Sequence, residues 1–185
     1  MKKRGNSLKI FQKENNKGQV WVETVIYLLI AFVMIGLVLS FVKPKVEEMR
    51  DKTILDQSLG ILKDIDSSIT TIGSAGNKRL LSVGLKKGSL IIDSENDIVK
   101  FEMESSYEYG EEGKLIDVGN IKVITEETGK DYVVTMTRDF SDGYDITYDA
   151  QQILKTLTKA TNAYSLYITN RGDSSNKVLI DFTTE

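Results

Sequence analysis

The chain has no cysteine and no histidine among its 185 residues. Their absence excludes disulfide bonds, zinc sites with Cys or His ligands, thiol nucleophiles and catalytic triads that use histidine as the base. Proline is scarce as well: the single one, Pro44, excludes a proline-rich chain. Hydrophobic residues make up 41% of the sequence, which is ordinary for a folded protein. The sequence therefore predicts a folded protein without thiol or histidine chemistry.

The apolar residues are concentrated near the start of the chain. Residues 24–42 form a run of 19 residues without a charged side chain, and most of them are large and apolar. As a helix with a rise of about 1.5 Å per residue, this run spans ~28 Å, close to the thickness of a bilayer core. We therefore predict a transmembrane helix over residues 19–43.

Charge is also distributed unevenly. Residues 1–18 form a leader with six basic side chains and one acidic side chain, so the net charge of −3 for the whole chain leaves −8 for the remainder. Basic residues gather on the cytoplasmic side of a membrane span, so we expect a cytoplasmic leader and an extracytoplasmic C-terminal part. An acidic exterior also predicts no nucleic-acid partner, because nucleic-acid binding needs a basic surface.

A second helical segment with a linker is predicted over residues 44–76. Its apolar residues step mostly by three and four positions, which is typical of a helix with one apolar face. They are Val46, Met49, Leu55, Leu59, Leu62, Ile65, Ile69 and Ile72. Pro44 is expected to kink the junction, because it removes one intrahelical donor. Gly73 is expected to end the helix. The stripe is wider than one contact needs, so one edge is expected to pack on the following domain and another is available to neighbouring chains.

From residue 77 onward the apolar pattern changes to a period of two, as in strands with one buried face. Val99, Phe101 and Met103 alternate with charged residues. Further strands are predicted at residues 89–92, 121–125, 131–138, 144–148, 164–168 and 178–182. Residues 151–160 fit a helix or a strand, and we favour a strand. The predicted fold class is α+β: a long N-terminal helix, transmembrane and then extracytoplasmic, followed by an antiparallel β-sandwich-like head over residues 77–185.

The junction between the leader and the apolar run is the most informative part of the sequence. Lys17 and Gly18 end the leader, Gln19 begins the apolar segment, and Glu23 is the acidic residue at its fifth position. A carboxylate in hydrocarbon costs ~2.5–3.5 kcal/mol at mid-helix and less near the edge, so Glu23 needs a partner. Glu23 either lies in the headgroup layer, where the helix dipole favours it, or pairs with an α-amine that cleavage between Gly18 and Gln19 creates on a neighbouring copy.

These features together resemble the class III, or prepilin-type, signal peptide of archaeal type IV pilin-like proteins. The resemblance covers residues 1–43. It implies that a prepilin peptidase cuts between Gly18 and Gln19 on the cytoplasmic side, and that the mature helices then bundle into a filament core, with Glu23 as the family's acidic residue. Within such a bundle, the small residues Ala31 and Gly36 would allow close approach of neighbouring helices.

The resemblance implies a structural subunit of a type IV pilus-like cell-surface filament. Its partners would be the membrane, the prepilin peptidase and further copies or other pilin-like subunits. It would be a single-pass protein of the cell membrane and, after processing, of the filament. No cofactor is expected, and no enzyme activity, since no pair of carboxylates is singled out by its spacing. The alternative from another class is a monomeric single-span surface protein whose β-domain binds a ligand or partner.

Two other patterns have ordinary explanations. The first is a pair of acidic series that offer the oxygen ligands calcium prefers: Asp93, Glu95 and Asp97, and then Asp139, Asp142, Asp145 and Asp149. Neither has the spacing of an EF-hand loop, so we interpret them as polar turns and solvent-facing strand positions and predict no metal site. The second is the adhesion tripeptide spelled by Arg171, Gly172 and Asp173. It falls in a predicted turn over residues 170–176, whose composition explains it.

Overall fold

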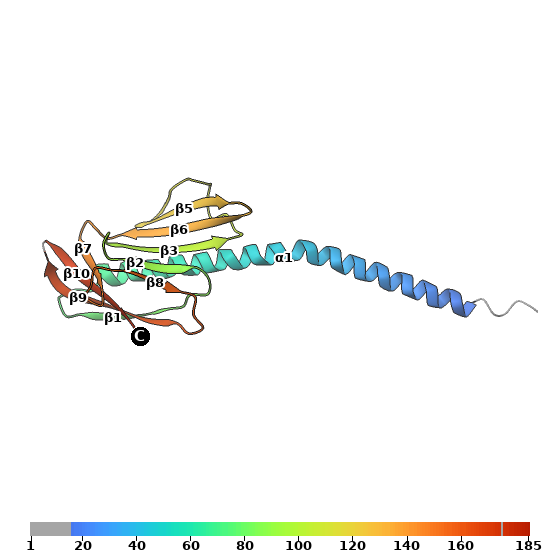
Figure 1. Cartoon of the computed structure of the whole chain (residues 1–185), viewed down its shortest axis with the longest axis horizontal. Coiled ribbons are helices and arrows are strands. Elements are labelled where there is room, and N and C mark those ends of the chain that lie inside the picture. The colour runs from blue at the N-terminus through green and yellow to red at the C-terminus, as the bar shows by residue number, and fades with distance from the viewer. Residues whose placement is uncertain (1–15, 175) are drawn as a thin grey trace, which may run out of the picture. The chain divides into compact units, whose positions relative to one another are not determined.

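The computed structural model describes residues 16–174 and 176–185, and for residues 16–19 and 174 it describes the backbone alone. The chain divides into two compact units, with the boundary between Lys45 and Val46. The first unit contains the N-terminal part of helix α1 (Asn16–Thr70). The second contains the rest of α1 and all ten strands of the described chain (Figure 1). Most of the predicted leader, residues 1–15, lies outside the described residues.

Helix α1 begins three residues before the predicted start at Gln19 and ends close to the predicted stop. Pro44 lies inside it, where its ring nitrogen cannot donate a hydrogen bond. After Thr70 the chain turns at Gly73, whose φ of 76° is the left-handed conformation that favours glycine. The side-chain amide of Asn77 donates to the carbonyl of Ile72 at 2.9 Å and so satisfies one of the free carbonyls near the end of the helix.

One sheet of the second unit has six strands, and all its neighbouring pairs are antiparallel. In spatial order they are β4 (Ile116–Val118), β5 (Ile121–Thr128), β6 (Asp131–Asp139), β3 (Ile98–Ser105), β2 (Ser89–Asp93) and β8 (Leu154–Thr158). In β3, Val99, Phe101 and Met103 are buried, whereas Glu102 and Glu104 are exposed. The period of two in the sequence therefore reflects a sheet with one buried face.

The other sheet has four strands. They are, in spatial order, β1 (Lys78–Val83), β9 (Tyr164–Ser174), β10 (Lys177–Thr184) and β7 (Tyr144–Tyr148). The pairs β1–β9 and β9–β10 are antiparallel, but β7 runs parallel to β10. The predicted α+β class, with a long N-terminal helix before a β-rich domain, is confirmed, and so is the strand favoured within residues 151–160. The parallel pair is the exception to the predicted antiparallel order.

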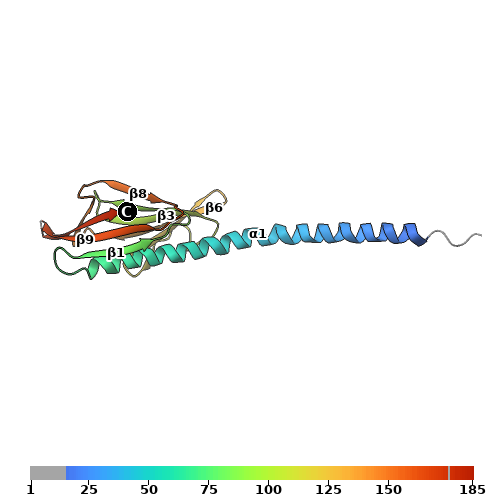
Figure 2. The ribbon, with the colours of Figure 1, turned by 90° about the horizontal axis from the view of Figure 1, so that it is seen from below.

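The core of the second unit lies between the two sheets and the later part of α1, which runs alongside the strands in both views (Figure 1 and Figure 2). The helix contributes six buried side chains to it: Leu55, Leu59, Leu62, Ile65, Ile69 and Ile72. Phe101 of β3 and Phe182 of β10 are among the largest buried side chains from the two sheets. Val46 and Met49 belong to the predicted stripe but are 40% and 69% exposed, so the buried face of α1 begins after them.

Asn170 in β9 holds the linker that follows α1. Its side-chain amide donates to the carbonyl of Gly73 at 2.6 Å, and its backbone exchanges hydrogen bonds with Gly76 and Asn77. Asn170 is only 4% exposed, so these bonds are shielded from water. The linker between helix and sheet is therefore fixed by one residue that lies almost one hundred positions later in the chain.

The predicted turn over residues 170–176 is wrong, because β9 continues to Ser174. Arg171 is an extra residue in β9, where the register with β10 shifts, and Gly172 has a φ of 102°. The Arg171 guanidinium pairs at 2.7 Å with Asp181, whose side chain is 1% exposed. The tripeptide of Arg171, Gly172 and Asp173 is thus part of a bulged strand, and its arginine is held by a buried carboxylate.

Candidate functional site

The part of α1 that belongs to the first unit exposes apolar side chains on all sides. Its large apolar side chains are between 45% exposed, at Val42, and 76% exposed, at Phe41, except for Val25, which is half-buried. Within the described residues, this is the one helix that is long and apolar enough to cross a membrane. Water is an unfavourable surrounding for so much contiguous apolar surface. The run is therefore consistent with a membrane anchor.

The predicted cleavage site lies in the first turn of α1. The backbone of Lys17, Gly18 and Gln19 is helical, while their side chains lie outside the description. A peptidase needs an extended backbone around the bond it cuts, so this turn has to unwind before cleavage. Gly18 favours unwinding, because glycine costs ~1 kcal/mol relative to alanine inside a helix. The helical backbone at this position is compatible with cleavage only if the turn opens.

Glu23 has a partner that the sequence analysis missed. It is exposed, and the hydroxyl of Tyr27 donates to its Oε1 at 3.1 Å. The two residues are four positions apart on one helix, a spacing at which side chains meet. The i,i+4 spacing was therefore the signal in the sequence that could have found Tyr27. Glu23 accordingly makes a polar contact within its own chain.

Ala31 and Gly36 do not form one small-residue face. They are five positions apart, and at about 100° per residue they point ~140° away from each other around the helix. Both are exposed, and a Cβ placed on Gly36 would meet nothing within 4 Å. Each residue therefore offers space on a different side of the apolar run.

Asp51 links α1 to the β domain, which is formed by the ten described strands of the second unit. The carboxylate is 6% exposed, and it accepts hydrogen bonds from Lys87 Nζ at 2.8 Å and from the backbone nitrogen and hydroxyl of Ser106 at 2.8 and 3.0 Å. Burial alone would raise the pKa of Asp51, but the hydrogen bonds from Lys87 and Ser106 and the charge of Lys87 outweigh it. The pKa of Asp51 therefore lies below its usual value. The ionised carboxylate is the form that these contacts stabilise.

Asp66 makes a second polar attachment fifteen positions further along α1. Its carboxylate pairs with Arg138 Nε of β6 at 2.5 Å and accepts from the side-chain amide of Asn120 at 3.1 Å. Fifteen residues are just over four helical turns, so Asp51 and Asp66 point ~60° apart around the helix, both toward the β domain. The two acids fix both the rotation and the axial position of this part of α1 against the sheets.

The two predicted acidic series serve turns and strand ends. Asp97 has a φ of 57°, accepts from the backbone nitrogen of Ile146 at 2.8 Å and pairs with Lys177 at 3.0 Å. Asp139 accepts two hydrogen bonds from Ser141, which together with nearby positive charge hold the pKa of Asp139 below its usual value although burial opposes the shift. Within residues 16–174 and 176–185, no three carboxylates are grouped so that they could hold a metal ion.

Comparison of the chain with protein-family models, with curated proteins and with solved structures gives no match. The functional argument therefore rests on the apolar run, on Glu23 and on the way in which Asp51 and Asp66 attach α1 to the β domain.

Proposed function

We propose that this chain is a structural subunit of a type IV pilus-like cell-surface filament of the archaeal type, and that it assembles through its apolar N-terminal helix after cleavage by a prepilin peptidase. The observation that carries the proposal is a difference in exposure between two parts of α1. Its residues 20–42 expose apolar side chains, and its residues from Leu55 onward are built into the core of a β domain. One helix therefore combines an assembly element with a firm attachment to a head.

The distribution of apolar side chains favours a bundle over a single partner. A helix that packs on one neighbour needs one apolar stripe, whereas a helix that is apolar on all sides is suited to lipid or to a bundle with neighbours all around it. In lipid, apolarity alone does not drive association, so close packing and polar contacts have to contribute. Ala31, Gly36 and Glu23 are the residues of the run that offer them.

In the proposed pathway the leader stays in the cytoplasm and the β domain lies outside the membrane. The peptidase removes residues 1–18, which leaves Gln19 at the start of the mature helix. The subunit then moves from lipid into the filament. No enzyme activity and no cofactor form part of this proposal.

Cleavage is tested on protein isolated from its native membrane. Mass spectrometry of the N-terminal peptide should find Gln19, or its pyroglutamate form, as the first residue. Gly18→Val should leave the leader attached, because a branched side chain at the scissile bond obstructs the peptidase. Gly36→Val, the same change farther along the helix, is the matched control and should be processed normally.

Electron microscopy of the same cells tests assembly. The proposal expects filaments that contain the processed chain and that are lost with Gly18→Val. An intact Met1 on a monomeric protein would contradict it and would leave the single-span surface protein as the better explanation.

A further inference from the structure

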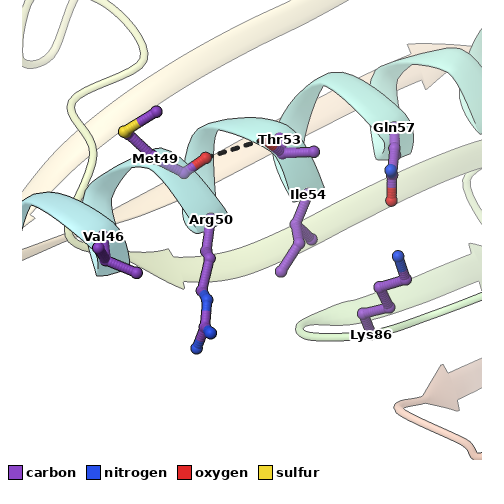
Figure 3. A pocket seen from close by; sticks show the side chains of 7 residues that line it. All are labelled: Val46, Met49, Arg50, Thr53, Ile54, Gln57 and Lys86. Atoms are coloured by element: carbon purple, nitrogen blue, oxygen red, sulfur yellow. Dashed lines mark hydrogen bonds between the residues drawn. The ribbon is translucent and has the colours of Figure 1, made fainter.

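A groove with an apolar floor runs along α1 just after Lys45, within the second unit. It has a volume of about 500 Å³ and is lined by Val46, Met49, Arg50, Thr53, Ile54, Gln57 and Lys86. Figure 3 shows Val46, Arg50 and Ile54 projecting from the same side of the helix, with Lys86 on a neighbouring loop. Two of the lining side chains are cationic and none is acidic, although the chain as a whole has a net charge of −3.

Within the described residues, the two cations of this groove, Arg50 and Lys86, are not tied up in ion pairs, and both are exposed. An adjoining hollow that both of them line also contains the acidic residues Glu47, Asp51 and Glu104. The neighbouring Lys87 differs, because it is held by Asp51 at 2.8 Å. That contact fixes the loop between β1 and β2 against the helix and so keeps Lys86 at the groove. Cations beside an apolar floor suit a ligand that has both an anionic and an apolar part.

The length of the chain keeps this groove near the end of the apolar run. Arg50 is eight residues beyond Val42, and eight residues reach at most ~29 Å even when fully extended. When residues 20–42 are embedded in a bilayer, the groove therefore lies within ~29 Å of the end of the run, a distance from which it can reach the lipid headgroups. Long basic side chains reach toward such a surface, and helical side chains tilt toward the N-terminus, which here is the membrane end.

We propose that this groove binds the headgroup of an anionic phospholipid. The phosphate lies on Arg50, an outer oxygen of the headgroup accepts from Lys86, and the glycerol and first acyl carbons lie on Val46 and Ile54. The proposal rests on the membrane anchor and not on filament assembly, so a failure of one does not entail a failure of the other.

The test uses the full chain in a mild detergent, mixed with equal amounts of phosphatidylglycerol and phosphatidylcholine, with retained lipid measured by native mass spectrometry. The wild-type protein should retain phosphatidylglycerol in preference. Arg50→Gln and Lys86→Gln should each lower this retention about fivefold, the effect of about 1 kcal/mol per basic residue at an anionic surface. Lys130→Gln, which removes an exposed cation from the turn between β5 and β6, is the matched control and should change nothing.

Several outcomes would overturn the proposal. One is equal retention of the two lipids by the wild type; another is equal retention of phosphatidylglycerol by the Arg50, Lys86 and Lys130 variants. Displacement of the lipid by millimolar inorganic phosphate would assign the groove to a soluble anion. If native mass spectrometry finds a wild-type dimer that the Arg50 and Lys86 variants lose while they retain phosphatidylglycerol, the groove would be assigned to a second copy of the chain. Circular dichroism should be the same for all variants, because the three substituted side chains are exposed.

Discussion

Asp51 shows how much of the second unit depends on a single carboxylate. It lies on α1 and binds residues 36 and 55 positions later in the chain. A buried acceptor of this kind stabilises a fold only while its donors stay in place, because each unpaired buried polar group costs ~1–3 kcal/mol. The sequence marks Asp51 merely as an acid beside an apolar stripe, so its partners were not predictable from it.

The first prediction concerns the loss of this charge. Asp51→Asn should lower the free energy of unfolding of the second unit by ~2–4 kcal/mol at pH 7, because Lys87 loses its counter-ion and Ser106 loses part of its acceptor. Urea unfolding of the full chain in detergent, followed by circular dichroism, measures this change. Asp56→Asn, an exposed acid of the same helix, is the control and should stay within about 0.5 kcal/mol of the wild type.

The same pair of proteins gives a pH dependence with a fixed sign. The pKa of Asp51 is lower in the folded than in the unfolded chain. Its contribution to stability is therefore complete above the unfolded value of about 3.9 and is lost as the pH falls through the folded pKa. The difference between wild type and Asp51→Asn should stay constant from pH 7 to about pH 5 and shrink below pH 4. A difference that grows on acidification would contradict this account.

At the scale of elements, regular spacing made most of the fold predictable. Apolar residues at steps of three and four identified the buried face of α1, and alternation identified all but two of the ten strands. The missed strands lack that signal. In β1 the adjacent Leu80 and Leu81 break the alternation, and Leu80 is 57% exposed. Strand β4 has only three residues. The extra residue Arg171 interrupts the alternation in β9, so the extension of this strand to Ser174 was not predicted.

Which strands pair with each other was harder to predict from the sequence than which segments form strands. The parallel pair of β7 and β10 joins residues that are more than thirty positions apart, with β8 and β9 between the two strands in the chain. A period of two records which face of a strand is buried and contains nothing about which neighbour it has. The predicted class was therefore correct, while the order of the sheets had to come from the structure.

The second prediction separates the roles of the two parts of α1. Leu62→Ala removes a side chain with no exposed surface from the core and should cost the second unit ~2–5 kcal/mol in its free energy of unfolding. Leu37→Ala makes the same change in the apolar run, where the side chain is 54% exposed, and should leave that free energy within about 0.5 kcal/mol of the wild type. Urea unfolding measures both. Equal losses for the two variants would show that the head depends on the apolar run.

At the scale of the whole molecule, the sequence located the candidate site through composition. An uncharged run predicts a membrane anchor, and the long apolar helix is consistent with it; cleavage after Gly18 and the role of Glu23 in assembly stay predictions. The attachments of α1 through Asp51 and Asp66 required the structure, because their partners are dispersed over several strands and loops. The sequence suggested that Glu23 needs a partner, and the hydroxyl of Tyr27 in its own chain already donates a hydrogen bond to its carboxylate. What has to be tested is whether Glu23 also needs a charged partner on a neighbouring chain.

The last prediction decides whether Glu23 acts through its charge in assembly. After cleavage, the α-amine of Gln19 would lie four positions before Glu23 in its own chain and near the same depth in a neighbouring chain. Glu23→Gln keeps the size and hydrogen-bonding groups of the side chain and removes the charge. The processed subunit should still accumulate in the membrane, since insertion becomes easier without a charge. Filaments should become scarce, because the amine of the neighbour loses its counter-charge in a medium of low dielectric.

Tyr27→Phe is the matched control, because it removes the hydroxyl that donates a hydrogen bond to Glu23 and keeps the charge of Glu23. If charge pairing drives assembly, Tyr27→Phe should form filaments nearly as well as the wild type, while Glu23→Gln should not. Filament yield by electron microscopy is compared at equal membrane levels of processed subunit. Equal yields for Glu23→Gln and wild type would refute charge pairing, as expected if Gln19 cyclises and its amine is lost. A loss with Tyr27→Phe as large as with Glu23→Gln would instead assign the role of Glu23 to the contact with Tyr27 inside one helix.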